Sequence, residues 1–527
     1  MATRNGEPME RGTGETLGEV VDRKIARRTL LKGMLAFPVV TLAPSFLMSR
    51  ASHGAEIDQL RYQPISLDSA DEIKVPSGYS ADVLLRWGDP ILAGAPDFDL
   101  RHQTAAAQSM QFGYNCDYVA FFPLGTASRE ASTRGILAVN HEYTNPELMF
   151  IDYNDKSPTK TQVDVQLAAH GLALVEIELV GGKWKPVKKS RYNRRITAET
   201  LMELTGKAAG NELLKTSYDS TGRKVRGTLN NCGGGVTPWG TLLTAEENFN
   251  QYFAHRNNLP DSDPRKAIHA RYSLPTDNSE RRWEDFHSRF DLAKEPNEPF
   301  RFGWVVEIDP LNPKFVPKKR TGLGRMKHEA ATVVVAPDRR IAVYTGDDER
   351  FDFIYKFVSK RPMSKRREDN FSVLDEGTLY VAKFEVDADG KGAGRWIPLV
   401  AGQGPLSTWT ESMILINTRG AADLVGATKM DRPEDIETNP VTAKVYVVCT
   451  FNERRGTTGN PGTDPANPNA KNEHGHIIEI TEDKNDHTST RFSWDISCCA
   501  ATPRRIATLI LPAATKAKSA LSLVPIT

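Results

Sequence analysis

The chain has 527 residues, of which 39% are hydrophobic and 26% are charged, and its 68 Lys and Arg residues almost balance its 67 Asp and Glu residues. This composition excludes an intrinsically disordered chain, and the formal net charge of +1 gives no sign of a nucleic-acid partner. The length suits one large domain built from repeated elements, or two to three smaller domains.

The first fifty residues differ from the rest of the chain. Arg27 and Arg28 stand just before a modest apolar stretch, "MLAFPVVTLAPSFLM", at residues 34–48. This pattern is typical of a signal for the twin-arginine (Tat) export machinery, and a basic tail on a cytosolic protein is the alternative. The apolar stretch is too short and too interrupted by proline for a stable membrane anchor. We predict a Tat signal peptide over residues 1–55 and a periplasmic or secreted protein.

From about residue 80 onward, short apolar or alternating runs bounded by Gly, Pro, Asn or Asp predict β-strands. Helical patterns are few and short, over residues 198–206 and 420–427. Many short strands favour a sandwich, a barrel or a propeller, and the length fits a β-propeller with long loop insertions best. The predicted strands span residues 118–124, 135–143, 170–179, 240–248, 302–309, 329–336, 340–349, 351–358, 377–386, 443–450 and 476–483.

Two polar stretches interrupt this pattern and are predicted to be insertions. Residues 253–300 are charged and contain proline, and residues 454–475 are rich in Gly, Pro and Asn. The second stretch fits either a flexible linker or an ordered loop near a site, since loops on rigid scaffolds carry function.

Side chains that suit metal ions gather at the ends of five predicted strands. A single acidic strand end is ordinary, but five such ends on a propeller can converge at the axis. Converging carboxylates repel one another unless cations neutralise them, and hard cations such as Ca²⁺ or Mg²⁺ prefer oxygen ligands. The clusters are Asn140, His141 and Glu142; Glu246, Glu247 and Asn248; His328 and Glu329; Asp347, Asp348, Glu349 and Asp352; and Asp431, Arg432, Glu434 and Asp435.

The last cluster contains a possible anion contact. If Pro433 keeps the backbone extended, Arg432 and Glu434 point to the same side of the chain. The glutamate could then bind a metal ion while the guanidinium receives phosphate beside it. A local surface ion pair is the alternative.

Cys232 is the one thiol in a stretch that also carries paired carboxylates, "NNCGGGVTPWGTLLTAEEN" at residues 230–248. The chain has five cysteines, and their odd number and long spacings do not resemble a disulfide framework. A thiolate favours a transition metal over calcium. The three glycines after Cys232 are predicted to leave room for a metal close to the backbone.

Several long motifs occur in a fixed order, and together they resemble the PhoX-type alkaline phosphatases. The resemblance covers about residues 20–495, nearly the whole chain. It rests on "FGYNCDYVAFFPL", "LAVNHEYTNPELMF", "NNCGGGVTPWGTLLTAEEN", "LGRMKHEAATV", "YTGDDERFDFIYKFV", "DRPEDIETNP" and "GHIIEI".

The resemblance implies a single propeller, for which we expect six blades, with ferric iron and calcium at its axis. It implies hydrolysis of phosphate monoesters, and of some diesters, by a metal-held oxo or hydroxide nucleophile. Cys232 matches an iron ligand of the family, Glu329 and Glu434 match metal ligands, and Arg432 matches the phosphate contact. Further acidic positions of the family are similar to Glu142, Glu247, Asp348 and Asp117.

The C-terminal end departs from the family pattern. "FSWD" at residues 492–495 is followed by a tail with Cys498 and Cys499 and without the expected closing strands. We expect one propeller domain over residues 56–527, with residues 497–527 truncated or shifted in frame and the closing blade incomplete. Poor folding or low activity of this chain would follow.

Two other functions remain open at the sequence level. One is a catalytically impaired, calcium-binding propeller that acts as a binding protein, and the other is a propeller esterase or lactonase. Cys232 distinguishes them from the phosphatase, because a structural calcium site or a calcium-dependent lactonase has no use for a thiolate. We expect a monomer whose partners are small phosphate esters and the Tat machinery.

Overall fold

The computed structural model describes residues 65–66, 69–125 and 131–499. Contacts divide the chain into one unit of residues 1–83 and 498–527 and a second unit of residues 84–497. In the first unit, the described residues 69–83 form neither helix nor strand. The predicted signal peptide and residues 500–527 of the predicted tail lie outside the described residues. Within the described parts, no helix is long and apolar enough to span a membrane.

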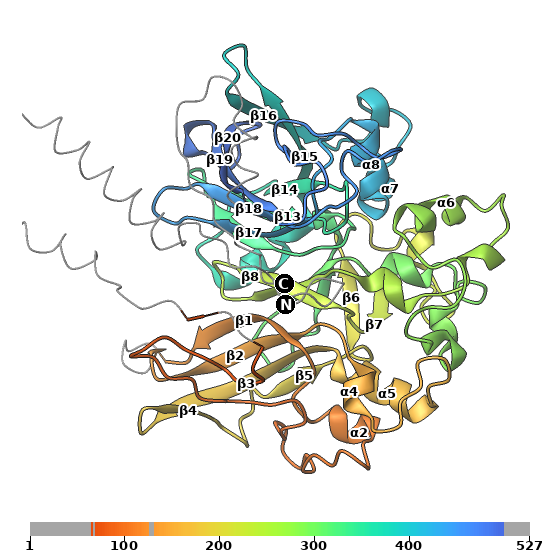
Figure 1. Cartoon of the computed structure of the whole chain (residues 1–527), viewed down its shortest axis with the longest axis vertical. Coiled ribbons are helices and arrows are strands. Elements are labelled where there is room, and N and C mark those ends of the chain that lie inside the picture. The colour runs from red at the N-terminus through yellow and green to blue at the C-terminus, as the bar shows by residue number, and fades with distance from the viewer. Residues whose placement is uncertain (1–64, 67–68, 126–130, 500–527) are drawn as a thin grey trace, which may run out of the picture. The chain divides into compact units, whose positions relative to one another are not determined.

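The second unit is mostly β-structure arranged in three sheets (Figure 1). The first sheet runs β1-β2-β3-β4, and β5 also pairs with β3. Every pair in it is antiparallel. Its strands are β1 (Cys116–Pro123), β2 (Arg134–His141), β3 (Gly171–Val180), β4 (Lys183–Pro186) and β5 (Arg194–Ile196).

The second sheet runs β7-β6-β11-β10-β9-β8, and its β11–β6 pair is parallel. Its strands are β6 (Leu201–Thr205), β7 (Lys224–Arg226), β8 (Asn231–Val236), β9 (Leu242–Glu246), β10 (Val305–Ile308) and β11 (Lys318–Arg320). The sequence pattern predicted a helix over residues 198–206, and this was wrong. Met202 and Leu204 are buried while Leu201 and Glu203 are exposed, which is the two-residue alternation of a strand.

The third sheet runs β12-β13-β14-β15-β16-β20-β19-β18-β17. Its two end strands meet, since β17 contacts β12 and β13, and a core that includes Tyr344, Trp396 and Ile478 fills the space inside. Its strands are β12 (Thr332–Val335), β13 (Ile341–Gly346), β14 (Ile354–Ser359), β15 (Gly377–Val386), β16 (Gly392–Pro398), β17 (Pro433–Thr438), β18 (Val445–Cys449), β19 (His476–Glu482) and β20 (Arg491–Cys499).

The helices are short and lie in the connections. One of them, α8 (Thr418–Leu424), confirms the helix predicted at residues 420–427. The predicted insertion at residues 253–300 is packed into the main core through Trp283, Phe290 and Phe300. The other α-helices are α2 (Ala105–Gln108), α4 (Pro146–Met149), α5 (Lys160–Ala169), α6 (Pro264–Arg271) and α7 (Glu411–Ile416), and the 3₁₀ turns in and beside the insertion include η3 (Phe249–Tyr252), η5 (Trp283–Asp285) and η7 (Glu298–Arg301).

Four hairpins of the second unit repeat one local geometry, although the sequence shows no repeat. In each hairpin a first residue accepts, at its carbonyl, the backbone N–H of a return residue on the second arm. The four pairs, with their N···O distances, are Asn115 with Glu142 (3.1 Å), Asn230 with Glu247 (2.9 Å), Lys327 with Asp348 (3.0 Å) and Arg432 with Thr450 (3.1 Å).

Three of the four first residues have left-handed backbone, with φ of 43° at Asn115, 51° at Asn230 and 44° at Arg432. The strand that follows each of them has a register shift, so the pairing is locally bulged. In every hairpin the third residue is of a metal-ligating type: Asp117, Cys232, Glu329 and Glu434.

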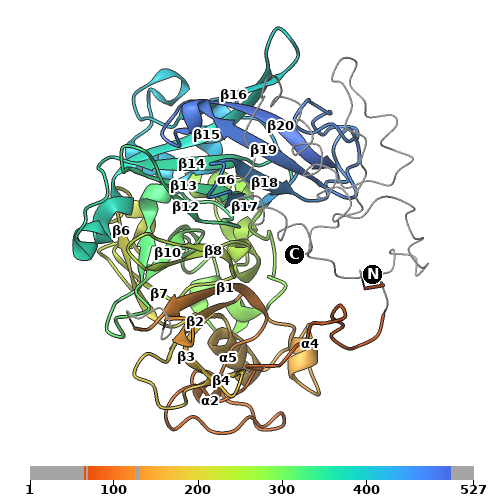
Figure 2. The ribbon, with the colours of Figure 1, turned by 90° about the vertical axis from the view of Figure 1, so that its left-hand side faces the viewer.

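The inner strands of these hairpins lie next to one another. β8 contacts β1, β2 and β12. Figure 1 and Figure 2 both show β8 lying between β1 and β17. The four third residues are therefore brought toward one region of the second unit.

The glycines after Cys232 allow the backbone of residues 329–331 to approach β8 closely. A Cβ at Gly233 would lie 1.6 Å from the carbonyl oxygen of Glu329, and one at Gly235 would lie 2.1 Å from that of Ala331. The prediction that these glycines leave room for a metal is wrong, because neighbouring backbone fills the space.

We predict that Gly233→Ala lowers the free energy of unfolding by about 3 kcal/mol or more, since the backbone of β8 must move away from residue 329. Chemical denaturation measures this change. Gly462→Ala is the control, because nothing lies within 4 Å of a Cβ there, and its effect should stay within about 0.5 kcal/mol. Equal effects of the two substitutions would contradict the packing argument.

Candidate metal centre

Cys232 lies at the meeting point of the hairpins. Its Sγ is 3.0 Å from Glu329 Oε1 and 3.4 Å from Asp117 Oδ2. Potential ligand atoms of Asp117, Glu142 and Cys232 all lie within 4.8 Å of one another, and so do those of Cys232, Glu247 and Glu329. Five of the seven predicted metal ligands thus form two overlapping groups that share the thiol.

The other two predicted ligands, Asp348 and Glu434, lie beside Arg432. Arg432 Nη2 is 2.7 Å from Asp348 Oδ2 and 3.1 Å from Glu434 Oε1. Thr450 Oγ1 donates to the same oxygen of Glu434 at 2.6 Å. Arg432 and Glu434 therefore do point to the same side, as predicted. Pro433 begins the strand β17, although Arg432 before it is left-handed.

Three buried carboxylate oxygens of these residues have no hydrogen-bond partner within the part of the chain that is described. They are Glu247 Oε1, Glu329 Oε2 and Asp348 Oδ1. A buried acceptor without a partner is costly, and a buried unpaired charge costs more. Bound cations remove both costs, so the residues present fit a metal centre. One thiol and several oxygens fit a mixture of a transition metal and a hard cation.

Burial and mutual repulsion set the protonation of these groups in the absence of metal. Burial, followed by the charge of Asp117, raises the pKa of Glu142 to about 8. Burial, followed by Asp348, raises the pKa of Glu434 to about 7. Burial also raises the pKa of Glu247, Glu329 and the Cys232 thiol well above their usual values. A bound cation reverses this balance, because it favours the ionised forms.

Residues that precede predicted ligands in the sequence form ion pairs and hydrogen bonds with other parts of the protein. Glu246 accepts from Lys319 Nζ at 2.7 Å, and Asp347 accepts from Arg419 Nε at 2.8 Å. His328 is bonded at both ring nitrogens, to Thr345 Oγ1 and to the carbonyl of Gly324. Consecutive residues of a strand face opposite sides, so one member of each predicted pair is structural and the next faces the centre.

Four other predicted ligand-type residues also bond within the protein. Asp352 pairs with Arg271, and Glu349 pairs with Lys327 at 2.9 Å. Asp431 accepts from Arg455, which anchors the loop at residues 454–475, and this supports an ordered loop. Asn140 donates to the carbonyls of Cys232 and Gly233 and so fixes the backbone at the thiol.

A cavity of about 350 Å³ lies beside the centre and includes Glu142 in its wall. Its other lining residues come from the segment after β2, the segment after β9 and the 253–300 insertion, and of these residues the sequence connected only Asn248 with a site. They are Tyr143, Asn248, Asn250, Gln251, Glu280 and Arg281. Thr450 was also missed, because a single threonine at a strand end carries no sequence signal.

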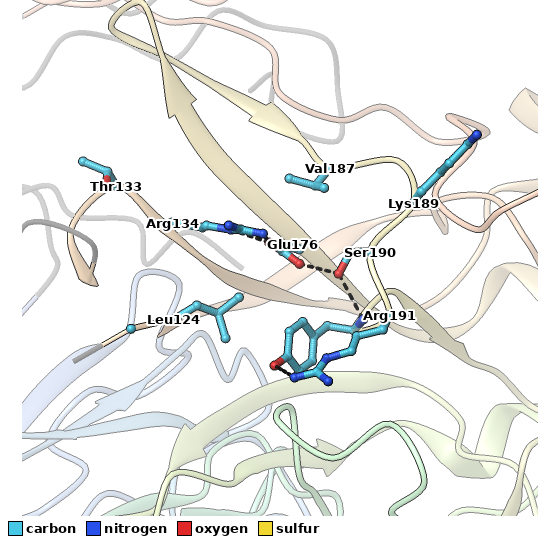
Figure 3. A pocket seen from close by; sticks show the side chains of 10 residues that line it. Leu124, Thr133, Arg134, Glu176, Val187, Lys189, Ser190 and Arg191 are labelled. Carbon is cyan, nitrogen blue, oxygen red and sulfur yellow. Dashed lines mark hydrogen bonds and ion pairs between the residues drawn. The ribbon is translucent and has the colours of Figure 1, made fainter. Parts of the chain in front are cut away.

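A second cavity, of about 720 Å³, lies on the first sheet (Figure 3). Glu176 is the one carboxylate among its lining residues, and Figure 3 shows Arg134 and Ser190 directed at it. Arg134 Nε donates to Glu176 Oε1 at 2.6 Å, and Ser190 Oγ donates to Oε2. This carboxylate is satisfied by the protein, unlike those of the metal centre.

Comparison with known proteins identifies the family. The family model "Alkaline phosphatase PhoX" matches residues 60–523. The chain belongs to the PhoX alkaline phosphatase family. A solved structure, Pseudomonas fluorescens PhoX in complex with vanadate, a transition state analogue, is 41% identical and superposes with a TM-score of 0.78. The match covers 84% of this chain and 77% of that one. A search of the curated proteins gave no match.

Family membership confirms several predictions from the sequence. The protein is an enzyme, a phosphoric monoester hydrolase of the alkaline phosphatase class, and its family is metal-dependent. Its mostly-β fold is also confirmed. The number of propeller blades, the identity of the metals and the role of each site residue stay predictions.

The metal-free protein should lose stability as pH rises. The pKa of Glu142 and of Glu434 is higher in the folded protein than the ordinary value of 4.5, so the folded state holds protons that the unfolded state has lost. Their contribution is fully present below about pH 4.5 and is lost as pH rises toward 8. We expect a decrease on the order of 1 kcal/mol per pH unit for each group.

Denaturation of chelator-treated protein between pH 5 and 9 measures this slope, and the metal-loaded protein is the control with a flatter profile. Glu142→Gln should reduce the slope of the metal-free protein. A metal-free protein whose stability is constant over this range would contradict the electrostatic description of the centre.

Proposed function

We propose that this centre holds ferric iron and calcium and hydrolyses phosphate monoesters, and some diesters. The observation that carries the proposal is the thiol of Cys232 among buried carboxylates with unpartnered oxygens. Asp117, Glu142, Cys232, Glu247, Glu329, Asp348 and Glu434 would hold the ions. When bound, the ions supply positive charge for the phosphate oxygens and lower the pKa of water.

Arg432 is the proposed phosphate contact. Its guanidinium is held over the ring of Phe451, 4.9 Å from the centroid, and against Asp348 and Glu434. Burial alone would lower the pKa of Arg432, but Asp348 and then Glu434 raise it on balance, so it stays charged. A fixed planar cation suits the equatorial phosphate oxygens, where charge lies in a loose transition state.

Thr450 and Arg432 share one oxygen of Glu434, so this carboxylate is oriented by two donors. The corresponding return residues of the other three hairpins are the carboxylates Glu142, Glu247 and Asp348. The fourth hairpin therefore offers a hydroxyl at the return position, where the others offer acids, and it carries the guanidinium of Arg432 at its first position. We propose that an anionic substrate approaches on this side, where repulsion is weakest.

The centre can be tested through its thiol. We predict that Cys232→Ala loses iron and p-nitrophenyl phosphate hydrolysis at alkaline pH, measured by metal analysis and initial rates. Cys449→Ala is a matched control. Cys449 is also buried, but it directly precedes the return residue Thr450 and is not one of the predicted ligands. Unchanged iron content and an unchanged rate in Cys232→Ala would refute the site assignment.

The phosphate contact can be tested separately. We predict that Arg432→Met lowers kcat/KM for p-nitrophenyl phosphate by about 100-fold or more, with partial recovery in Arg432→Lys. Arg395→Met, which removes an exposed pair with Glu385 on β15, is the control and should change the rate little. If Arg432→Met hydrolyses the ester like the control, this arginine does not contact phosphate.

We further propose that the protein reaches the periplasm or the exterior through the Tat machinery, and that residues 56–527 form one propeller, with six blades as the resemblance implies. The four repeated hairpins support the propeller proposal, because their first strands would be the inner strands of separate blades. Replacing Arg27 and Arg28 by lysine should leave the enzyme in the cytoplasm, as cell fractionation would show. Normal export of that variant would refute the Tat proposal.

A further inference from the structure

We infer that the cavity beside Glu142 receives the alcohol part of the phosphate ester, and that it favours uncharged, hydroxyl-rich alcohols. This inference rests on the proposed function, because it takes the metal centre as the place where phosphate binds. It assigns substrate preference to the segment 248–251 and to Arg281.

The position of the cavity comes from Glu142. A carboxylate oxygen of Glu142 belongs to the ligand group that also contains Asp117 and Cys232. The residue also lines the cavity. Glu142 therefore joins the two places, and a group attached to a phosphate at the centre would reach the cavity beside it.

The lining is polar on nearly every side. Three amides, one phenol, two carboxylates and one guanidinium line the cavity, and none of the described lining residues has an aliphatic side chain. An apolar leaving group would leave these groups without partners, which selects against it. The volume of about 350 Å³ lies at the lower end of the usual range of ligand sites, about 300–1,000 Å³, so it suits a small alcohol such as a sugar or glycerol.

Two lining residues keep hydrogen-bonding capacity that the described residues do not use. Asn250 donates through Nδ2 to the carbonyl of Ser273, which leaves its Oδ1 without a partner. Among the residues that the structure describes, Arg281 Nε also finds no acceptor. A hydroxyl group both donates and accepts. After small side-chain shifts, a substrate hydroxyl could donate to Asn250 Oδ1 or accept from Arg281 Nε.

Arg281 is held firmly in place. Its Nη1 donates to the carbonyl of Thr144 at 2.5 Å, and its Nη2 donates to Gln251 Oε1 at 3.1 Å. The guanidinium also lies 5.6 Å from the ring centroid of Tyr252. Two carboxylates, Glu142 and Glu280, line the same cavity, so Arg281 gives it no surplus positive charge for a second phosphate, and an uncharged alcohol fits better.

The test compares two substrates in one variant. We expect Gln251→Leu to lower kcat/KM for glucose 6-phosphate by about tenfold and kcat/KM for p-nitrophenyl phosphate by less than about threefold. Arg281→Met should shift the ratio of the two in the same direction. Arg191→Met, in the separate cavity of Figure 3, is the matched control and should leave the ratio unchanged.

Equal changes for both substrates in Gln251→Leu, with wild-type iron content and melting temperature, would overturn the inference. A wild-type protein that hydrolyses neither substrate would instead refute the proposed function. Because Gln251 lies outside the predicted ligands, its substitution separates the two outcomes.

Discussion

Mutual repulsion among buried acids is the constraint on which the site depends. Six carboxylates and one thiol are brought together by four hairpins, and three of the carboxylate oxygens have no partner among the described residues. Burial and like charge both raise the pKa of Glu142, Glu247 and Glu329, so these groups cannot all ionise unless cations join them. A fold that carries such a cluster is expected to be completed by metal ions, and the family is metal-dependent.

The hairpin geometry explains how strands deliver so many ligands to one place. In three of the four hairpins a left-handed, bulged start turns the inner strand. In all four the third residue is a predicted ligand, and the return residue follows on the second arm. The residues just before the return positions point the other way and are held by the protein, as Glu246 is by Lys319 and Asp347 by Arg419. The buried ion pairs behind the centre fix the backbone of the ligands, while the ligands themselves keep free oxygens for cations.

The sequence predicted the mostly-β fold, the family and the set of residues that meet, because the ordered motifs are long and lie at strand ends. It could not separate ligands from structural acids within a motif such as "GDDE", since that depends on which face of a strand each residue occupies. Packing decided other details: the glycines after Cys232 admit a neighbouring strand, and residues 201–205 form a strand. Arg281 comes from a polar insertion without periodicity and Gln251 from the turn η3 just before it, and only the folded chain brings them beside Glu142.

Iron X-ray absorption spectroscopy of the purified, metal-loaded protein tests the central claim most directly, because it reports which atoms surround the metal. We expect one sulfur atom among the iron ligands, together with oxygen ligands, and loss of the sulfur contribution in Cys232→Ser. A spectrum of the wild type with only oxygen and nitrogen ligands, or an unchanged sulfur contribution in Cys232→Ser, would contradict a centre built around this thiol.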